Sequence, residues 1–204
     1  MELRCLAETD SPRWAAARRL LGPDAPTALQ TWGDAPILER APLVALLCSL
    51  KCPGELILKT YDLARRLRDE GIAVIGGFHS PMEREALHIL LKGQQPLVIC
   101  LGRSLEGARL PGAYRRPLEE GRLLLLSPFE ASQCRLTAQR ARERNLLVGA
   151  LAERILILHA EPGGKVAEAC GEFVRWGKPV LAVRHPANEH LATLGVRLEA
   201  DPLA

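Results

Sequence analysis

Six short, wholly apolar runs alternate with longer amphipathic segments along most of the chain. Strands that are apolar throughout, and not only at every second residue, are typical of a parallel sheet covered by helices on both faces. The runs are LVALLC from Leu43, IAVIGG from Ile72, PLVICLG from Pro96, RLLLLS from Arg122, RILILHA from Arg154 and PVLAV from Pro179. We therefore predict an α/β fold, a Rossmann-like, doubly wound and mostly parallel sheet of about six strands flanked by helices.

The segments between these runs have helical periodicity. In ELILKTYDLARRLRDEG, for example, Ile57, Tyr61 and Leu67 fall on one helical face. A closed barrel of eight strands and eight helices would need more residues and two more strand–helix units. We expect residues 1–42 to form an N-terminal helical and extended segment, and residues 43–204 to form the Rossmann-like domain.

Composition excludes several classes of protein. With 48% hydrophobic and 25% charged residues, the chain is too apolar to be disordered, and its 204 residues suit one main domain. No apolar run approaches the roughly 18 residues of a membrane helix, and MELRCLAETD lacks the pattern of a secretory signal. We expect a cytoplasmic protein with no membrane partner. The net charge of +3 permits an anionic partner without requiring one.

Cysteine and histidine do not form a metal-binding pattern. The six cysteines are scattered, and CSLKC has one residue too many for the common C-x-x-C clamp. The five histidines include no H-x-x-x-H pair. No G-x-S-x-G elbow is present either. We therefore expect reduced thiols, no metal site and no other cofactor.

The residues that follow the apolar runs are the candidate ligand-binding residues, because a doubly wound sheet binds its ligand beyond the carboxyl ends of its strands. Glycines let the backbone approach a phosphate, and a helix that begins there presents its first amides to an anion. This pattern predicts phosphate binding. The alternative for the second group is simply a tight, well-capped turn from strand to helix. The candidates are Ser49 and Lys51 after the first run, Gly76, Gly77, His79 and Ser80 after the second, Arg103 after the third, and Gly163, Gly164 and Lys165 after the fifth.

Arg144 and Asn145 interrupt an otherwise apolar helical segment before the fifth run. On a helix, Asn145 shares a stripe with Ala141 and Val148, so it should face the sheet, where a buried amide needs hydrogen-bond partners. We expect Asn145 to brace the strand-end loops and Arg144 to project toward a bound phosphate. The competing interpretation is a surface Arg144 beside a local helix defect.

These residues resemble the DNA-processing protein A (Smf) family, whose Rossmann-like domain is related to that of the cytokinin-activating nucleotide hydrolases. The resemblance covers roughly Pro36 to Pro186, and its best-kept element is Arg144-Asn145 with VGALAERILILHAEPGG after it. The family's Gly-Ser-Arg turn keeps its serine as Ser49 but loses the arginine. The hydrolases' Pro-Gly-Gly-x-Gly-Thr-x-x-Glu motif keeps only its Pro-Gly-Gly.

The resemblance implies a non-enzymatic protein that binds single-stranded DNA through an electropositive strand-end crevice. It also implies a role in recombination or DNA uptake, with a recombinase as a further partner and a homodimer as an option. The alternative is a sensor or hydrolase of a nucleotide derivative that uses the same crevice, with Glu83 or Glu161 as general base. A binding scaffold without a small ligand is the third possibility.

Overall fold

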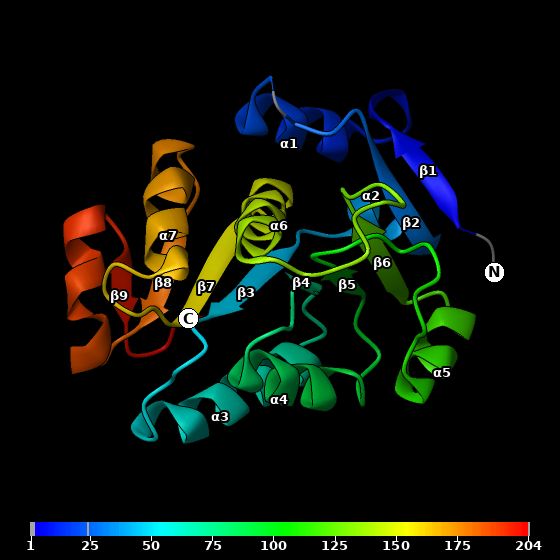
Figure 1. Cartoon of the computed structure of the whole chain (residues 1–204). Coiled ribbons are helices and arrows are strands. Elements are labelled where there is room, and N and C mark those ends of the chain that lie inside the picture. Colours follow the sequence, from blue (N-terminus) through cyan, green and yellow to red (C-terminus); the bar gives the residue numbers. More distant parts are fainter. Residues whose placement is uncertain (1–2, 24, 204) are drawn as a thin grey trace.

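The computed structural model describes residues 3–23 and 25–203, in which one mixed sheet runs through the whole molecule (Figure 1). The strand order is β1-β2-β6-β5-β4-β3-β7-β8-β9. All neighbours from β6 to β9 pair in parallel, whereas β1–β2 and β2–β6 pair antiparallel. The strands are β1 (Arg4–Ala7), β2 (Ala28–Gly33), β3 (Val44–Cys48), β4 (Val74–Gly76), β5 (Leu97–Cys100), β6 (Leu123–Ser127), β7 (Arg154–His159), β8 (Val180–Val183) and β9 (Arg197–Glu199).

The six apolar runs form the six central strands, β3 to β8, which confirms the predicted α/β class. The count of about six was too low, because the described sheet has nine strands. The additional strands are β1 and β2 at one end of the sheet and β9 at the other. The outermost two, β1 and β9, are edge strands, which do not need to be apolar on both faces. In β1 only Leu6 is buried, and no residue of β9 is fully buried. Residues 4–33 thus contribute two strands to the same sheet as the rest of the chain.

Helices cover both faces of the sheet, and each covered face holds its own apolar core. Helices α1 (Pro12–Leu21), α2 (Ile37–Arg40), α6 (Ala138–Leu151) and α7 (Lys165–Arg175) pack on one face. Helices α3 (Glu55–Asp69), α4 (Pro81–Leu90) and α5 (Arg115–Glu119) pack on the other. Three short 3-10 segments complete the chain: η1 (Glu8–Asp10), η2 (Gly112–Tyr114) and η3 (Pro186–Leu194). Within the described residues, no helix is long and apolar enough to cross a membrane.

The strand order reverses between β3 and β7. From β3 the chain builds outward through β4, β5 and β6 on one side, and later through β7, β8 and β9 on the other. Cys48 at the end of β3 lies opposite His159 at the end of β7. In an open α/β sheet, the crevice beyond the carboxyl ends at such a reversal is the expected ligand site.

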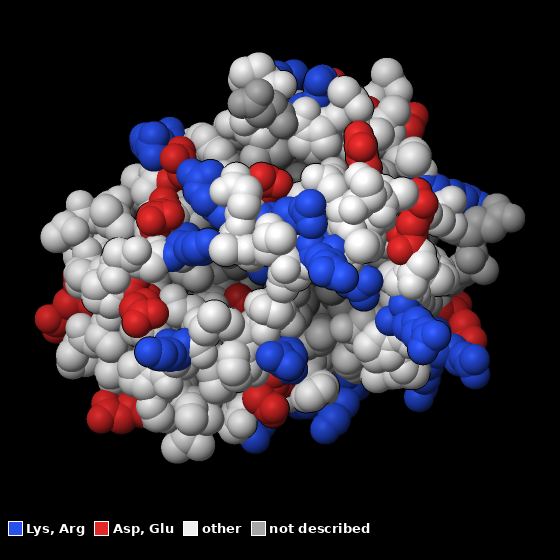
Figure 2. Space-filling view, in the orientation of Figure 1, with Lys and Arg blue, Asp and Glu red and all other residues white. Residues whose placement is uncertain are grey.

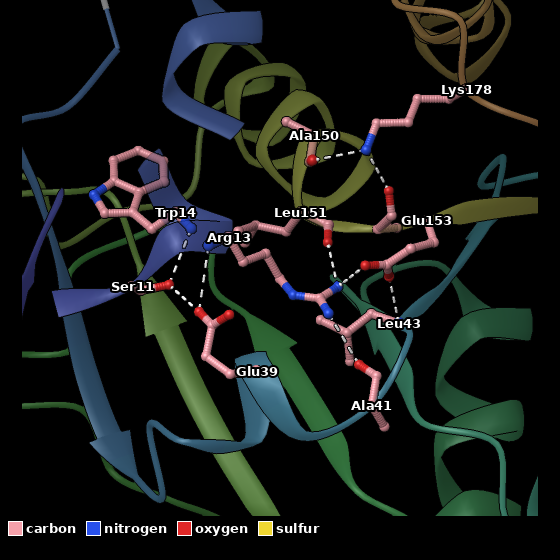
Figure 3. A network of polar contacts seen from close by, with 11 residues as sticks. Ser11, Arg13, Trp14, Glu39, Ala41, Leu43, Ala150, Leu151, Glu153 and Lys178 are labelled. Atoms are coloured by element: carbon pink, nitrogen blue, oxygen red, sulfur yellow. Dashed lines mark hydrogen bonds and ion pairs between the residues drawn. The ribbon is translucent and has the colours of Figure 1, made fainter. Parts of the chain in front are cut away.

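A polar network at the opposite, amino edge anchors α6 (Figure 3). The guanidinium of Arg13 donates a 3.1 Å hydrogen bond to the Leu151 carbonyl and pairs with the Glu153 carboxylate. The Lys178 ammonium donates a 3.1 Å bond to the Ala150 carbonyl. Cations at a helix C-terminus satisfy its last carbonyls and complement its dipole. The C-terminal end of α6 is therefore held in place, and its N-terminal half reaches the carboxyl edge of the sheet.

Candidate functional site

Four neighbouring strands bring the candidate loops to one edge of the sheet. In the order β5-β4-β3-β7, their carboxyl ends carry Arg103, the loop Gly76 to Ser80, the loop Ser49 to Lys51, and the loop Gly163 to Lys165. Adjacent strands lie about 4.8 Å apart, so these four ends span roughly 14 Å. We call these four loops and the surface between them the strand-end crevice, by analogy with the ligand crevice of other open α/β sheets. The structure thus places every loop predicted from the sequence along a single line.

Ser49 joins the two loops at the point where the strand order reverses. It is buried, its backbone N–H donates to the His159 carbonyl at 2.9 Å, and its Oγ accepts from the Glu161 N–H at 2.9 Å. The neighbouring Lys51 and the Lys165 at the start of α7 are both exposed. Ser49 therefore has a positioning role, while the two lysines are open to a ligand.

A histidine and an asparagine that the sequence did not single out lie beside this junction. The Asn188 amide nitrogen donates to the carbonyls of Leu158 at 3.1 Å and Val183 at 2.9 Å, which leaves its Oδ1 as an acceptor for His159 Nδ1 at 3.0 Å. His159 Nδ1 consequently carries the hydrogen, and Nε2 keeps a free lone pair. Burial lowers the pKa of His159, which favours this neutral form.

Glu83 ties the end of β3 to the start of α4. Its Oε1 accepts from the Cys48 N–H at 2.8 Å, and its Oε2 accepts from the N–H groups of His79 at 2.7 Å and Ser80 at 3.2 Å. The Ser80 hydroxyl accepts the Glu83 N–H in return, which completes a capping box. The amides of His79 and Ser80 and that of Glu83 in α4 are therefore occupied by protein atoms, as in the capped-turn interpretation of this loop. Burial raises the pKa of Glu83, whereas the nearby Arg144 opposes that rise.

Phe78 has an unusual backbone conformation in the same loop. Its φ of 47° lies in the left-handed region, which costs a residue with a side chain about 1–2 kcal/mol. The ring is buried in the core beside Gly76, where an added Cβ would lie 3.0 Å from the ring carbon Cζ. The turn thus places the Phe78 ring in the core, while the neighbouring Gly77 contacts Arg144.

The Arg144 guanidinium packs directly on Gly77. Arg144 is only 4% exposed, and a Cβ added to Gly77 would lie 2.0 Å from Arg144 Nη1. Arg144 Nε donates a 2.9 Å bond to Asn145 Oδ1, which confirms that Asn145 is buried and bonded. The interpretation of Arg144 as a surface residue is wrong, because the short loop over Gly77 leaves room for the guanidinium beneath the surface. Among the described residues, Asn145 supports the loop through its bond to Arg144.

Arg144 carries a buried charge that feels the nearby Glu83 carboxylate but makes no ion pair with any described residue. Neither terminal nitrogen of its guanidinium has a hydrogen-bond or ion-pair partner among the described residues. A buried charge is costly unless it is paired, so this arrangement favours an anion from outside the chain. The same charge, after burial itself, lowers the pKa of the exposed His79.

Unpaired cations extend along the same edge. Elsewhere on the surface, some cations pair with a carboxylate, among them Arg66, Arg68 and Arg116. Others, such as Arg19 and Lys92, are exposed and have no ion pair to a described residue. At the crevice, four cations other than Arg144 lack an ion pair to any described residue: Lys51, Arg84, Arg103 and Lys165. Figure 2 shows a band of Lys and Arg side chains that crosses the middle of the view from beside α7 toward α5.

The start of α7 is open, unlike that of α4. Its N-cap residue is Gly164, which supplies no side-chain hydrogen bond to the first amides. Gly163 has a φ of 66°, and a Cβ on Gly164 would lie 2.9 Å from the Glu161 carbonyl oxygen. Both positions therefore favour glycine, and the first amides of this 11-residue helix, which follows the carboxyl end of β7, receive no side-chain cap. Such a helix start is suited to an anion.

A family model described as DNA recombination-mediator protein A matches residues 5–197. The chain belongs to this family. Membership confirms the resemblance inferred from the sequence and extends it to the N-terminal strands. None of the curated proteins matches the sequence well enough to count as a relative.

Solved structures of similar fold include two DNA processing protein A molecules. That from Streptococcus pneumoniae has a TM-score of 0.80 at 17% identity, over 100% of this chain and 73% of that one. That from Helicobacter pylori, described with its single-stranded DNA binding mode, has a TM-score of 0.72 at 22% identity, over 88% and 84%. A molybdenum cofactor binding protein from Rippkaea orientalis reaches a TM-score of 0.58 at 13% identity, over 80% and 92%. At these identities the likeness concerns the fold alone.

Proposed function

We propose that this DNA-processing family member binds single-stranded DNA along the strand-end crevice and has no catalytic activity of its own. The observation that carries the proposal is the buried Arg144 guanidinium, which lies on Gly77 and whose terminal nitrogens have no hydrogen-bond partner in the part of the chain that the structure describes. The unpaired cations on both sides of it extend the electropositive surface. The DNA-binding relative from Helicobacter pylori supports the choice of ligand.

The spread of the cations favours a chain of phosphates over one mononucleotide. Arg103, Arg144, Lys51 and Lys165 are distributed over four strand ends that span roughly 14 Å, which is more than one phosphate group covers. We expect base stacking to contribute less, because aromatic residues make up only 4% of the chain and Trp14, Phe129 and Phe173 among them are buried. We therefore expect binding that depends on the backbone and is largely independent of base sequence.

A nucleotide-derivative sensor or hydrolase is the second candidate. The exposed Glu161 carboxylate lies beside the open start of α7 and next to the junction at Ser49, so it can serve as general base. Glu83 is unsuited to that role, because it is 3% exposed and both of its oxygens accept backbone N–H groups. The second candidate function therefore depends on Glu161 as its general base.

We further propose, from family membership, that the protein acts in recombination or DNA uptake in the cytoplasm. A recombinase is the proposed partner protein, and a homodimer is the proposed assembly. These proposals rest on the matched family and not on a particular contact in the chain.

Titration of a labelled oligonucleotide at several salt concentrations tests the binding proposal. Each phosphate neutralised on a single strand adds about −0.7 to the slope of log affinity against log salt, so four contacts predict roughly −2 to −3. The exposed Lys51→Gln should reduce the slope by about 0.7. Arg154→Gln is the matched control, because Arg154 is exposed at the amino end of β7. A flat salt response, or displacement by a micromolar mononucleotide, would favour the second candidate.

A further inference from the structure

A surface pocket lies between β2 and α5. Its volume is about 530 Å³, which is within the range of sites that bind small molecules. The pocket is on the face of the sheet that α3, α4 and α5 cover, because Trp32, Leu110 and Leu118 pack in the apolar core of that face. We call it the Trp32 pocket. Its wall includes Trp32 of β2, Leu110 and Pro111 before η2, and Arg115, Leu118 and Glu119 of α5.

The lining of the Trp32 pocket suits a flat ring with a polar edge. Trp32 is half-buried, and its indole N–H has no acceptor among the described residues and is not fully enclosed. Leu118 is buried and supplies an aliphatic surface in the same pocket. Arg115 and Glu119 are exposed, lie one helical turn apart, and make no ion pair with a described residue. The aromatic and aliphatic wall matches the face of a nucleobase, and the two charged side chains match its donors and acceptors.

One segment connects the strand-end crevice with the Trp32 pocket. It begins at Arg103, after the carboxyl end of β5, and ends at Arg115 in the pocket wall. Arg103, Arg109 and Arg115 make no ion pair with a described residue, and Glu106 is the single acidic residue of the segment. The strand order β5-β6-β2 puts β2 about 10 Å from β5. The band of Lys and Arg side chains in Figure 2 runs in the same direction, toward α5. A single-stranded DNA that leaves the crevice at Arg103 can thus continue to the pocket over a positively charged surface.

We propose that the Trp32 pocket binds one nucleobase of the single-stranded DNA whose phosphates lie in the strand-end crevice. The base stacks on the Trp32 indole, and its polar edge meets Arg115 and Glu119 at the rim. This inference rests on the proposed function, because the DNA in the crevice delivers the base. Every nucleobase has an aromatic face, so the contact tolerates any sequence. Bases in a duplex are held in their stack, so the pocket favours a single strand over a duplex.

An abasic oligonucleotide separates the base contact from the phosphate contacts. It has the phosphates of an oligothymidylate of the same length but no bases. With the full chain, Trp32→Ala should weaken binding of the oligothymidylate about five- to thirtyfold, as expected for the loss of one stacked base. The same variant should bind the abasic oligonucleotide within about twofold of the parent. The slope of log affinity against log salt should not change, because no phosphate contact is lost.

Trp176→Ala is the matched control. Trp176 is also half-buried, and its ring centroid lies 5.7 Å from that of Phe173 at the end of α7. It does not line the Trp32 pocket, so its removal should leave the affinity for both oligonucleotides unchanged. Trp32→Phe gives a second measurement that does not require the alanine variant to fold. The tryptophan fluorescence of the parent should fall when the oligothymidylate binds, and most of that change should be absent from Trp32→Phe.

Three results would overturn the inference, and they separate it from the proposed function. If Trp32→Ala weakens binding of both oligonucleotides equally, Trp32 supports the fold and not a base. If the parent binds the abasic oligonucleotide as tightly as the oligothymidylate, or Trp32→Phe keeps the full fluorescence change, no base enters the pocket. In these two cases the crevice proposal stands, because the parent binds the oligonucleotide. If the parent binds neither oligonucleotide at any salt concentration, the proposed function and this inference both fail.

Discussion

Gly77→Ala tests whether the absence of a side chain at position 77 is what allows the Arg144 guanidinium to pack there. The added Cβ would lie 2.0 Å from Arg144 Nη1, 2.1 Å from Cζ and 2.5 Å from Nε, whereas ordinary contacts begin at 3.4 Å. The guanidinium must therefore move by more than 1 Å, although it is buried and bonded to Asn145. Overpacking of this kind costs about 1–3 kcal/mol, and we expect a loss of about 2 kcal/mol in the free energy of unfolding.

A double-mutant cycle with Arg144→Ala isolates this contact. When Arg144 is shortened, the new Cβ has space, and Gly77→Ala should then cost less than about 0.5 kcal/mol. The expected coupling energy is thus roughly 1.5 kcal/mol, measured by urea denaturation of the four proteins. Gly77→Ala should also weaken oligonucleotide binding, because it displaces the guanidinium from the crevice.

Gly112→Ala is the matched control for the cycle. Nothing lies within 4 Å of a Cβ at Gly112, and its φ is not positive, so its substitution should leave stability within about 0.5 kcal/mol of the parent. If the effects of Gly77→Ala and Arg144→Ala on the free energy of unfolding are additive within about 0.5 kcal/mol, the proposed contact between position 77 and the Arg144 guanidinium is refuted.

Three further predictions concern the groups around this contact. Asn145→Ala should lower the free energy of unfolding by about 1–3 kcal/mol, because Arg144 Nε loses its acceptor; unchanged urea denaturation would contradict this. Glu83→Gln should cost about 1–3 kcal/mol, because one carboxylate oxygen that accepts backbone N–H becomes a donor; a variant as stable as the parent would exclude that role. Stability should fall as the pH drops from about 7 toward 5, because burial lowers the pKa of His159 and the unfolded chain takes up its proton first, near pH 6.5. The raised pKa of Glu83 acts with the opposite sign, so the measurement compares the pH slope of the parent with that of His159→Gln, and equal slopes would refute the assignment.

The central fold is encoded in local sequence patterns. An apolar run such as RILILHA specifies a strand buried on both faces, and this requirement does not depend on which strands become its neighbours. The end of helix α3 was also predictable from the sequence, because Gly71 marks a helix stop and has a φ of 71° in the structure. Strands β1 and β9 were not predicted from the sequence, because an edge strand of mixed polarity is defined by its partner strand and not by its own residue pattern.

The candidate loops were also predictable, since the rule for carboxyl strand ends needs only the end of each apolar run. Helical periodicity likewise placed Asn145 on a buried stripe. The contacts that give these residues their roles were not predictable. Glu83 accepts an N–H from a residue 35 positions away, and His159 meets Asn188 at a separation of 29.

Arg144 shows most clearly what only the tertiary structure decided. The sequence allowed either a surface arginine or one directed at a ligand, and periodicity cannot distinguish them. That the guanidinium is buried is decided by a loop on a different strand, where the glycine at position 77 leaves space for it. Strand and helix patterns depend on burial along one segment, which the local sequence records. The fit of one side chain against a distant backbone depends on how the strands are ordered in the sheet, and that order is established only when the chain folds.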